Sequence, residues 1–308
     1  MSYYDNKMMS ELENGRTPPR AGDMPGGGEE SYRPFRRKAA LRDEPKTVLR
    51  EEPVEPHILT EEVRVETLPA VLPNTWEQLQ SVSISMRDQY LSRAPLVNFF
   101  RETPTARAFD ILRTRLLQTL KHEGWRRVAI VAPTSGCGAT FTATNLALSL
   151  ARVPDSRTIL MDMNMRDPGV KSALDIAALG QQQKFLDGQH ALQDHLVRCS
   201  NTLAVGLTDT ASTNAAELLQ SQACGEALDA MIEDVQPDVV LYDLPPVLAH
   251  DDLTAFMGQI DGVLLVSDGE QTTSDQVKAC EKIIGGHVPL LGVILNRGRG
   301  SRLEAYAS

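Results

Sequence analysis

A glycine-containing loop after a short apolar run is the first stretch of this sequence that could do chemistry. Residues 132–140 read Ala-Pro-Thr-Ser-Gly-Cys-Gly-Ala-Thr and lead into a helical stretch. Inward-turned N–H groups and the positive end of the helix dipole would suit nucleotide phosphates, and the Thr140 hydroxyl stands where a P-loop ligates Mg²⁺. However, Pro133 and Ala139 replace the first glycine and the lysine of a P-loop. A simple glycine turn between a strand and a helix therefore accounts for the loop alone about as well.

Two carboxylates follow other short apolar runs. Asp162 comes directly after the run at 158–161, and Asp243 follows the run at 239–242. A carboxylate at a strand end that faces a phosphate loop could orient Mg²⁺ or a nucleophile, and an Asp after four apolar residues is typical of a Walker B carboxylate. Asp is also common as a helix N-cap, which is the simpler role for Asp162. Three such features at three strand ends are much less expected by chance.

The elements that must position these residues alternate between strands and helices. Apolar runs without polar alternation, separated by helical stretches, predict a doubly wound parallel sheet with helices on both faces. Ligands of such sheets bind beyond the carboxyl ends of the strands, so we expect Thr140, Asp162 and Asp243 to converge on one crevice there. The strands are predicted at 127–132, 158–161, 202–205, 238–242, 262–266 and 290–295, and the helices at 76–91, 104–121, 140–150, 225–233 and 274–284.

The first 75 of the 308 residues differ in composition from the rest. They hold nine of the 18 prolines and three consecutive glycines, and they mix 14 acidic with 11 basic side chains. Such a segment cannot bury enough apolar surface to offset the entropy lost on ordering, so we expect a disordered N-terminal arm over 1–75. A P-loop-like α/β domain is predicted over 76–300, followed by a short C-terminal tail at 301–308.

Composition and charge argue against several classes of protein. The formal net charge of −10 does not suit a protein that coats nucleic acid through its phosphates. No run approaches the roughly 18 apolar residues of a membrane helix, and the N-terminus lacks an apolar signal segment. The four cysteines are widely spaced, with no zinc pattern or disulfide framework. We therefore expect a cytoplasmic protein that binds no nucleic acid.

The motifs occur together in one order along the chain. They are 132–140, 144–147, 159–166, 214–219, 239–246, 261–266, 272–273 and 292–296. Through them, residues 104–297 resemble the cytoplasmic bacterial tyrosine kinases of capsule and exopolysaccharide synthesis, a P-loop group related to the MinD-like and ParA-like ATPases. The resemblance implies a P-loop NTPase-type sheet, ATP and Mg²⁺ as ligands, and a role beside a membrane polysaccharide co-polymerase.

The resemblance also implies roles for individual residues. Asp162, Asn164 and Arg166 match the catalytic stretch called Walker A′, in a degenerate form. The Mg²⁺ ligands would be Thr140, Asp162 and Asp243. The residues that would bind the nucleotide lie in the loop, at the start of the next helix and at the end of the last strand: Ser135, Gly136, Cys137, Gly138, Ala139, Thr140, Phe141 and Asn296.

Departures from the family pattern predict a weakened activity. Ala139 replaces the Walker A lysine, and Asn164 replaces the second carboxylate of Walker A′. Losing one positioned cation or donor commonly costs on the order of 10²–10³ in rate. The ring-assembly motif Glu-x-x-Arg-x-x-Arg aligns with Arg107, Asp110 and Arg113, which reverses the charge at its first two places. Homo-oligomeric rings are therefore less expected than a mixed oligomer with a partner of opposite charge.

These observations predict a tyrosine-kinase-like protein of exopolysaccharide or capsule biosynthesis, with weak or absent phosphotransfer and weak or lost ATP binding. It would regulate polymerisation or export through a membrane co-polymerase or an active kinase subunit. That partner would hold it peripherally at the inner face of the cell membrane. Two alternatives stay open: an active autophosphorylating protein tyrosine kinase that uses an unusual loop, and a ParA-like or MinD-like ATPase.

Overall fold

The computed structural model describes residues 74–84, 96–97 and 101–298. The predicted arm, apart from its last two residues, and the predicted tail at 301–308 lie outside the described residues. Within the described ranges, no helix is both long enough and apolar enough to cross a membrane.

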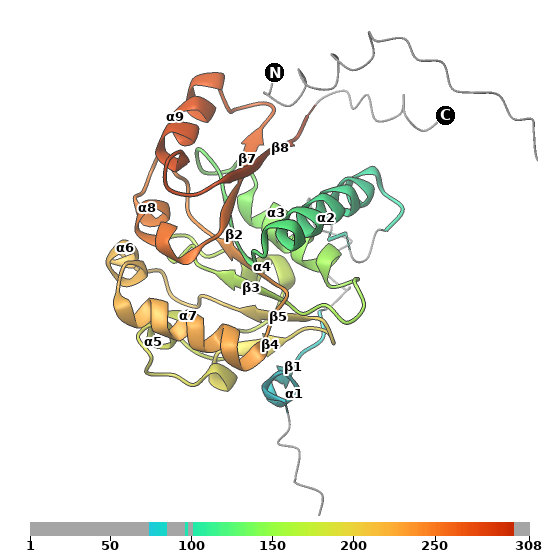
Figure 1. The fold of residues 1–308 in the computed structure, drawn as a ribbon, viewed down its shortest axis with the longest axis vertical. Helices are drawn as coiled ribbons and strands as arrows, with labels where there is room; N and C mark the ends of the chain where they lie inside the picture. Colours follow the sequence, from blue (N-terminus) through green and yellow to red (C-terminus); the bar gives the residue numbers. More distant parts are fainter. Residues whose placement is uncertain (1–73, 85–95, 98–100, 299–308) are drawn as a thin grey trace, which may run out of the picture. The chain divides into compact units, whose positions relative to one another are not determined.

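Eight strands form one sheet in the order β1-β4-β5-β3-β6-β2-β7-β8 (Figure 1). All neighbouring strands run parallel except β4 and β5. The predicted doubly wound sheet is therefore confirmed, with one antiparallel pair that was not expected. The strands are β1 (Gln80–Ser81), β2 (Arg127–Val131), β3 (Thr158–Asp162), β4 (Leu196–Arg198), β5 (Leu203–Gly206), β6 (Val239–Asp243), β7 (Gly262–Asp268) and β8 (Leu290–Asn296).

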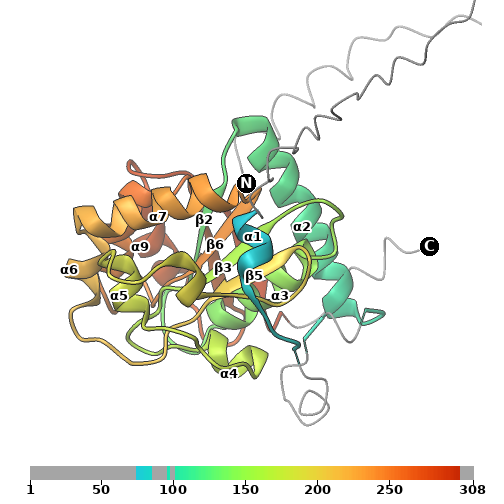
Figure 2. The same cartoon turned by 90° about the horizontal axis from the view of Figure 1, so that it is seen from below.

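Helices cover both faces of the sheet, as Figure 2 shows from the side of α1. α2, α3 and α4 pack over one apolar core, while α5 to α9 contribute side chains to a second core on the opposite face. The helices are α1 (Thr75–Gln78), α2 (Pro104–Glu123), α3 (Ala139–Leu150), α4 (Val170–Leu174), α5 (Gln182–Leu186), α6 (Ala215–Leu219), α7 (Gln222–Val235), α8 (Asp252–Phe256) and α9 (Ser274–Ile284), with single 3₁₀ turns at Leu192–Asp194 and Met257–Gln259.

The formation of α2 and of α3, which packs against it, has clear local causes. α2 begins with Pro104 after Thr103, whose hydroxyl accepts a hydrogen bond from the N–H of Ala106, and it ends at Gly124 in the left-handed conformation (φ 73°). α3 lies between α2 and the sheet, so most of its side chains are buried and it lacks a polar face. This burial holds α3, and with it the loop that precedes it, in a fixed place against β2.

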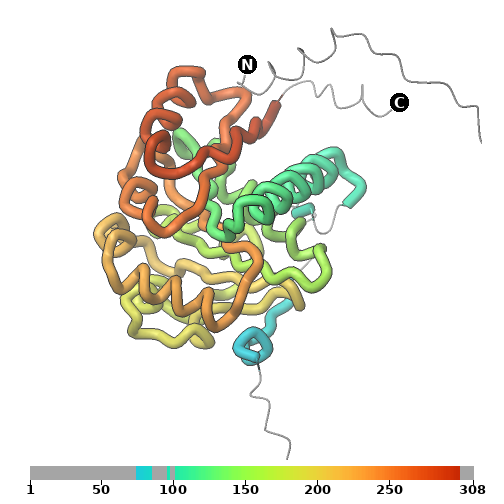
Figure 3. Tube along the Cα trace, in the orientation of Figure 1, coloured from blue at the N-terminus to red at the C-terminus, as the bar shows by residue number. Residues whose placement is uncertain are grey.

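The prediction of a helix over 76–91 is wrong. The helix ends at Gln78, because Leu79 is extended (φ −61°, ψ 138°) and the next two residues pair with β4 as strand β1. Trp76 anchors this turn, since its side chain is buried and its indole N–H donates to the Asn201 carbonyl at 3.0 Å. Figure 3 shows this segment at the end of the sheet opposite β8. Residues 85–91 lie outside the described part of the chain.

The antiparallel strand β4 also has a local cause. Only residues 199–202 separate β4 from β5. A connection this short can join antiparallel neighbours but cannot make the crossover that parallel strands require. The other predicted strands and the helices at 104–121, 140–150, 225–233 and 274–284 are all present, with bounds shifted by three residues at most.

Candidate nucleotide-binding site

The two predicted carboxylates stand side by side at the ends of neighbouring strands. Asp162 ends β3 and Asp243 ends β6, and the two residues are partners in the register of this strand pair. On its other side, Asp243 is paired with Ile130 of β2, two residues before the glycine loop begins at Ala132. Both carboxylates are fully buried. The structure thus brings together the ends of β2, β3 and β6, as the sheet topology predicts.

The loop between β2 and α3 depends on its glycines. Gly136 and Gly138 both have left-handed backbone conformations (φ 79° and 95°), which residues other than glycine rarely adopt. A Cβ atom on Gly138 would also lie 2.3 Å from the amide nitrogen of Asn296. Gly138 is the N-cap of α3, and no side chain caps the first turn of this helix. The N–H groups at the start of α3 are therefore available to an anion.

A cavity of about 240 Å³ is lined by the glycine loop and by residues that follow β3 and β6, but not by Asp162 or Asp243. Thr140 lines it, and the side chain of Thr140 lies close enough to Asp243 to lower the pKa of that carboxyl. A Cβ atom on Gly169 would lie 2.9 Å from the Thr140 methyl group, so the loop after β3 lies directly over this threonine. The cavity is lined by Ala132, Thr134, Ser135, Gly136, Cys137, Gly138, Ala139, Thr140, Asn164, Asp167, Gly169, Leu244 and Pro246.

Burial dominates the electrostatics of the carboxylate pair. It raises the pKa of Asp162 well above its usual range, and the neighbouring Asp243 raises this pKa further. Burial also raises the pKa of Asp243 to about 7. Asp162 Oδ2 accepts a hydrogen bond from the Val170 N–H at 3.1 Å, and this N–H and the nearby backbone N–H groups of Asn164 and Gly169 partly offset the rise in its pKa. Its Oδ1 and both carboxylate oxygens of Asp243 form no hydrogen bond of standard geometry with any described residue.

Three orphaned, buried carboxylate oxygens beside a threonine hydroxyl fit a divalent cation with oxygen ligands. No group of three or more His, Cys, Asp or Glu side chains in the described ranges could hold a metal ion by itself. This matches Mg²⁺, which commonly keeps water and substrate phosphates as ligands beside one or two carboxylates. Thr140, Asp162 and Asp243 are therefore suited to the role that the sequence predicts.

Arg166 does not reach the cavity. Its Nε donates to the buried Asp252 Oδ2 at 2.8 Å, its Nη1 donates to the Thr213 carbonyl at 3.3 Å, and Asp251 lies 3.8 Å from its Nη2. Asn164 does line the cavity, where its Oδ1 accepts a hydrogen bond from the Asp167 N–H at 3.2 Å. The predicted Walker A′ stretch is therefore divided. Asn164 lines the cavity, Asp162 is fully buried and does not line it, and Arg166 is held by carboxylates from the α8 region.

Two other predicted nucleotide contacts, Asn296 and Phe141, instead make contacts within the protein. The amide of Asn296 donates to the Cys137 carbonyl at 2.9 Å, which ties the end of β8 to the loop. Phe141 packs edge-on against Phe109 of α2, with ring centroids 6.0 Å apart. Neither Asn296 nor Phe141 lines the cavity. The sequence pattern also missed Asp167, which lines the cavity from the loop after β3.

No lysine or arginine of the described residues lines the cavity. Lys171 follows the loop after β3, but its Nζ pairs with Asp209 Oδ1 at 2.6 Å. With Ala139 in the loop and Arg166 paired elsewhere, the described site contains two buried acids and no nearby cation of its own. The groups there that are suited to binding phosphate are backbone N–H groups and hydroxyls.

The chain is similar in sequence and in fold to several known proteins. The tyrosine-protein kinase YwqD of Bacillus subtilis is 31% identical over 203 residues, which cover 64% of this chain and 83% of YwqD. The putative tyrosine-protein kinase EpsB of Ralstonia solanacearum is 28% identical over 238 residues, or 71% of this chain. The tyrosine kinase domain of BceF superposes with a TM-score of 0.58 at 26% identity, covering 71% of this chain and 91% of that domain. No protein-family model matches the chain.

The sheet, the glycine loop and the paired carboxylates define a P-loop type of nucleotide-binding fold. Within that class, the chain belongs to the bacterial tyrosine-protein kinase family. It spans only about 30% of the length of its EpsB relative.

Proposed function

We propose that this protein is a Mg²⁺-dependent nucleotide-binding regulator of exopolysaccharide or capsule assembly, with weak or absent phosphotransfer. It would act by binding a membrane co-polymerase or an active kinase subunit at the inner face of the membrane. The names of its relatives support the proposal. EpsB and YwqD are called tyrosine-protein kinases, and a further relative from Klebsiella pneumoniae is named as a putative tyrosine-protein kinase in the cps region.

One observation carries the proposal of weak phosphotransfer: no described cation lines the cavity. Phosphoryl transfer depends on positioning and on neutralising charge that develops on the phosphate oxygens. Ala139 supplies no charge, and the guanidinium of Arg166 is already neutralised by Asp252, whose side chain is fully buried. Moving Arg166 into the site would leave a buried carboxylate unpaired, which is strongly unfavourable.

The remaining groups support binding of a metal–nucleotide complex. Asp162, Asp243 and Thr140 would hold Mg²⁺, which supplies positive charge to bridging phosphates when it is bound. The N–H groups of the loop and the start of α3 would hold phosphate oxygens. Asn296 fixes the loop in this conformation through its bond to the Cys137 carbonyl.

Restoring the ammonium group tests the proposal directly. Calorimetric titration with Mg·ATP and Mg·ADP should show weak binding in the wild type and clearly tighter binding in Ala139→Lys. Ala139→Met is the matched control, because it adds a long side chain without charge. Equal affinity in the wild type and in Ala139→Lys would show that the missing ammonium does not limit binding.

An active tyrosine kinase is the second candidate, favoured by the intact pair of carboxylates beside Thr140. Incubation of the pure protein with labelled Mg·ATP separates the two. Robust phosphotyrosine or ADP release that disappears in Asp243→Asn would refute the regulatory proposal. Absence of both products, together with binding of Mg·ATP, would support it.

A further inference from the structure

A second cavity, of about 260 Å³, lies at the far end of α3 from the glycine loop. Arg152, just beyond the end of α3, and Arg101 line it together with Ser200 from the connection between β4 and β5. The helix between the two cavities has 12 residues and is therefore about 18 Å long. This cavity shares no lining residue with the candidate nucleotide site.

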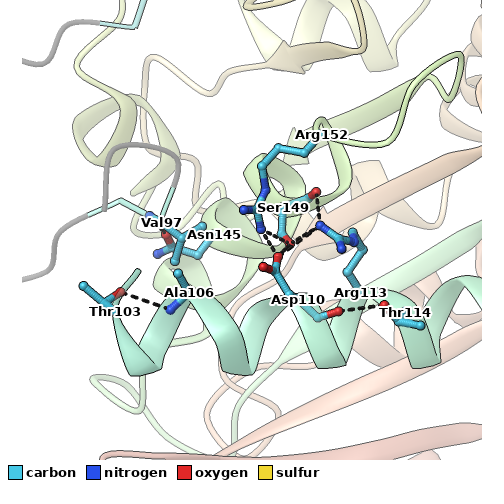
Figure 4. A network of polar contacts seen from close by, with 9 residues as sticks. All are labelled: Val97, Thr103, Ala106, Asp110, Arg113, Thr114, Asn145, Ser149 and Arg152. Atoms are coloured by element: carbon cyan, nitrogen blue, oxygen red, sulfur yellow. Dashed lines mark hydrogen bonds and ion pairs between the residues drawn. The ribbon is translucent and has the colours of Figure 1, made fainter. Parts of the chain in front are cut away.

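Positive charge exceeds negative charge around this second cavity. Figure 4 shows Asp110 of α2 between Arg113 and Arg152, and both arginines form ion pairs with it. One carboxylate thus serves two guanidinium groups. Arg101 is exposed and forms no ion pair with any described carboxylate. The three arginines together leave an excess of about two positive charges.

The guanidinium of Arg152 also has an unused donor. Its Nη2 bonds to Asp110 and to the Ser149 hydroxyl at 2.9 Å, but its buried Nε–H has no hydrogen-bond partner among the described residues. Burial lowers the pKa of Arg152, and the nearby Arg101 lowers it further, which agrees with two guanidinium groups that face the same space. The Nε–H of Arg152 has almost no solvent-accessible surface, so an anion in the cavity would act on the guanidinium groups of Arg101 and Arg152 through their charge and would offset their mutual repulsion.

We propose that this cavity binds a phosphate monoester with a small apolar body. Arg101 and Arg152 would share the dianionic phosphate, since the planar guanidinium forks match its oxygens. The Ser200 hydroxyl offers a further donor, while Leu148 and Leu203 form an apolar part of the wall. The alternative role for Arg152 is a brace between α2 and α3 alone. That role gives no reason for Arg101 to face the same cavity and predicts no response to phosphate.

The test uses the full chain and two probes, inorganic phosphate and phenyl phosphate, in calorimetry and thermal unfolding at constant ionic strength. We expect phenyl phosphate to bind more tightly than inorganic phosphate and to raise the unfolding temperature. Arg101→Ala should weaken binding on the order of tenfold or more, because one of two charge-assisted contacts is lost. Arg101 has no described ion pair to break, so this variant should fold normally.

Three further variants test whether the phosphate binds in this cavity. Arg115→Ala removes an equally exposed arginine of α2 that does not line the cavity, and it should bind phenyl phosphate as the wild type does. Thr140→Ala alters the nucleotide site and should leave this binding intact, which keeps the result independent of the proposed function. Arg152→Lys keeps a positive charge but loses the planar guanidinium that can donate two parallel hydrogen bonds, so binding of phenyl phosphate should weaken.

The proposal is overturned if Arg101→Ala and the wild type bind phenyl phosphate equally, or if Arg115→Ala weakens binding as much as Arg101→Ala does. Loss of binding in Thr140→Ala alone would assign the anion to the glycine loop. Benzoate that binds as tightly as phenyl phosphate would refute the choice of a phosphate ligand.

Discussion

Replacing Asp243 by asparagine should stabilise the protein at neutral and alkaline pH. The carboxyl of Asp243 is fully buried, has no hydrogen bond of standard geometry with a described residue, and has its pKa raised to about 7 by burial. Its unfolded-state pKa is about 3.9. Between these values the folded protein binds more protons than the unfolded chain, so the free energy of unfolding falls as pH rises from about 4 to 7.

The change in the free energy of unfolding follows from the size of the pKa shift of Asp243. Three pKa units correspond to about 4 kcal/mol at pH 8, at 1.36 kcal/mol per unit. The asparagine amide would itself lack a full set of partners, at a cost of roughly 1–3 kcal/mol. We therefore expect Asp243→Asn to raise the free energy of unfolding by about 1–3 kcal/mol at pH 8. Little or no gain is expected near pH 4, where the wild-type carboxyl is protonated in the folded state and about half protonated in the unfolded chain.

Urea unfolding of the wild type and Asp243→Asn, at pH 8 and pH 4 without divalent cations, measures this difference. Asp234→Asn is the matched control, because Asp234 is exposed on α7 and its replacement should change stability very little. A destabilised Asp243→Asn at pH 8, or an equal effect at both pH values, would show that the buried charge is not what limits stability. Added Mg²⁺ should stabilise the wild type and not the variant.

Two further perturbations test the packing. His195→Leu should remove one pH-dependent contribution: burial lowers the pKa of His195 to about 4, so this imidazole alone destabilises the wild type by about 3 kcal/mol as pH falls from 6.5 to 4, and the free energy of unfolding of the variant should rise relative to that of the wild type by this amount. Trp76→Ala should destabilise the domain by about 3–5 kcal/mol, because it empties a buried site that includes the indole–Asn201 bond and the Arg157 guanidinium over the ring. Chemical unfolding across this pH range measures both.

Each of these variants has a specific control. His122→Leu replaces an exposed histidine and should follow the wild type across this pH range, so a gain over the wild type at pH 4 like that of His195→Leu would contradict the reasoning. Trp76→Phe keeps an aromatic ring beneath Arg157 but loses the bond to Asn201 and part of the buried ring surface, so it should cost less than Trp76→Ala. Equal losses in the two Trp76 variants would contradict the assignment of most of the stability to buried ring surface.

The strands and long helices could be predicted because their signals are local. The run before Asp243 is apolar at every position, and the α2 stretch repeats apolar residues at helical spacing between a threonine cap and a terminal glycine. The five-residue helices α4, α5, α6 and α8 are too short to give a period. Strand β1 has only two residues, and the anchoring of Trp76 at Asn201, 125 residues away, places it.

In the site, too, some features follow from the local sequence and the strand order, while others depend on contacts far apart in the chain. The meeting of Asp162 and Asp243 follows from strand order, since the carboxyl ends of parallel neighbours share one edge. The direction of Arg166 does not follow from its position after β3. It is set by Asp252, which is 86 residues further along the chain and buried without another described cation beside it. A motif thus placed the backbone of this stretch correctly but could not determine which carboxylate would hold its guanidinium.

In the nucleotide complex that we propose, the charge of the site makes the metal more important than in a loop that carries a lysine. Two adjacent buried carboxylates are costly, and asparagine at either place would relieve the repulsion without changing the strands. Their presence is understandable when a cation is bound during function. With Ala139 in the loop, that cation cannot be an ammonium group of the loop itself. Mg²⁺ therefore has to offset both the carboxylates and the phosphates in the nucleotide complex that we propose, so binding of nucleotide without Mg²⁺ would be opposed by uncompensated negative charge.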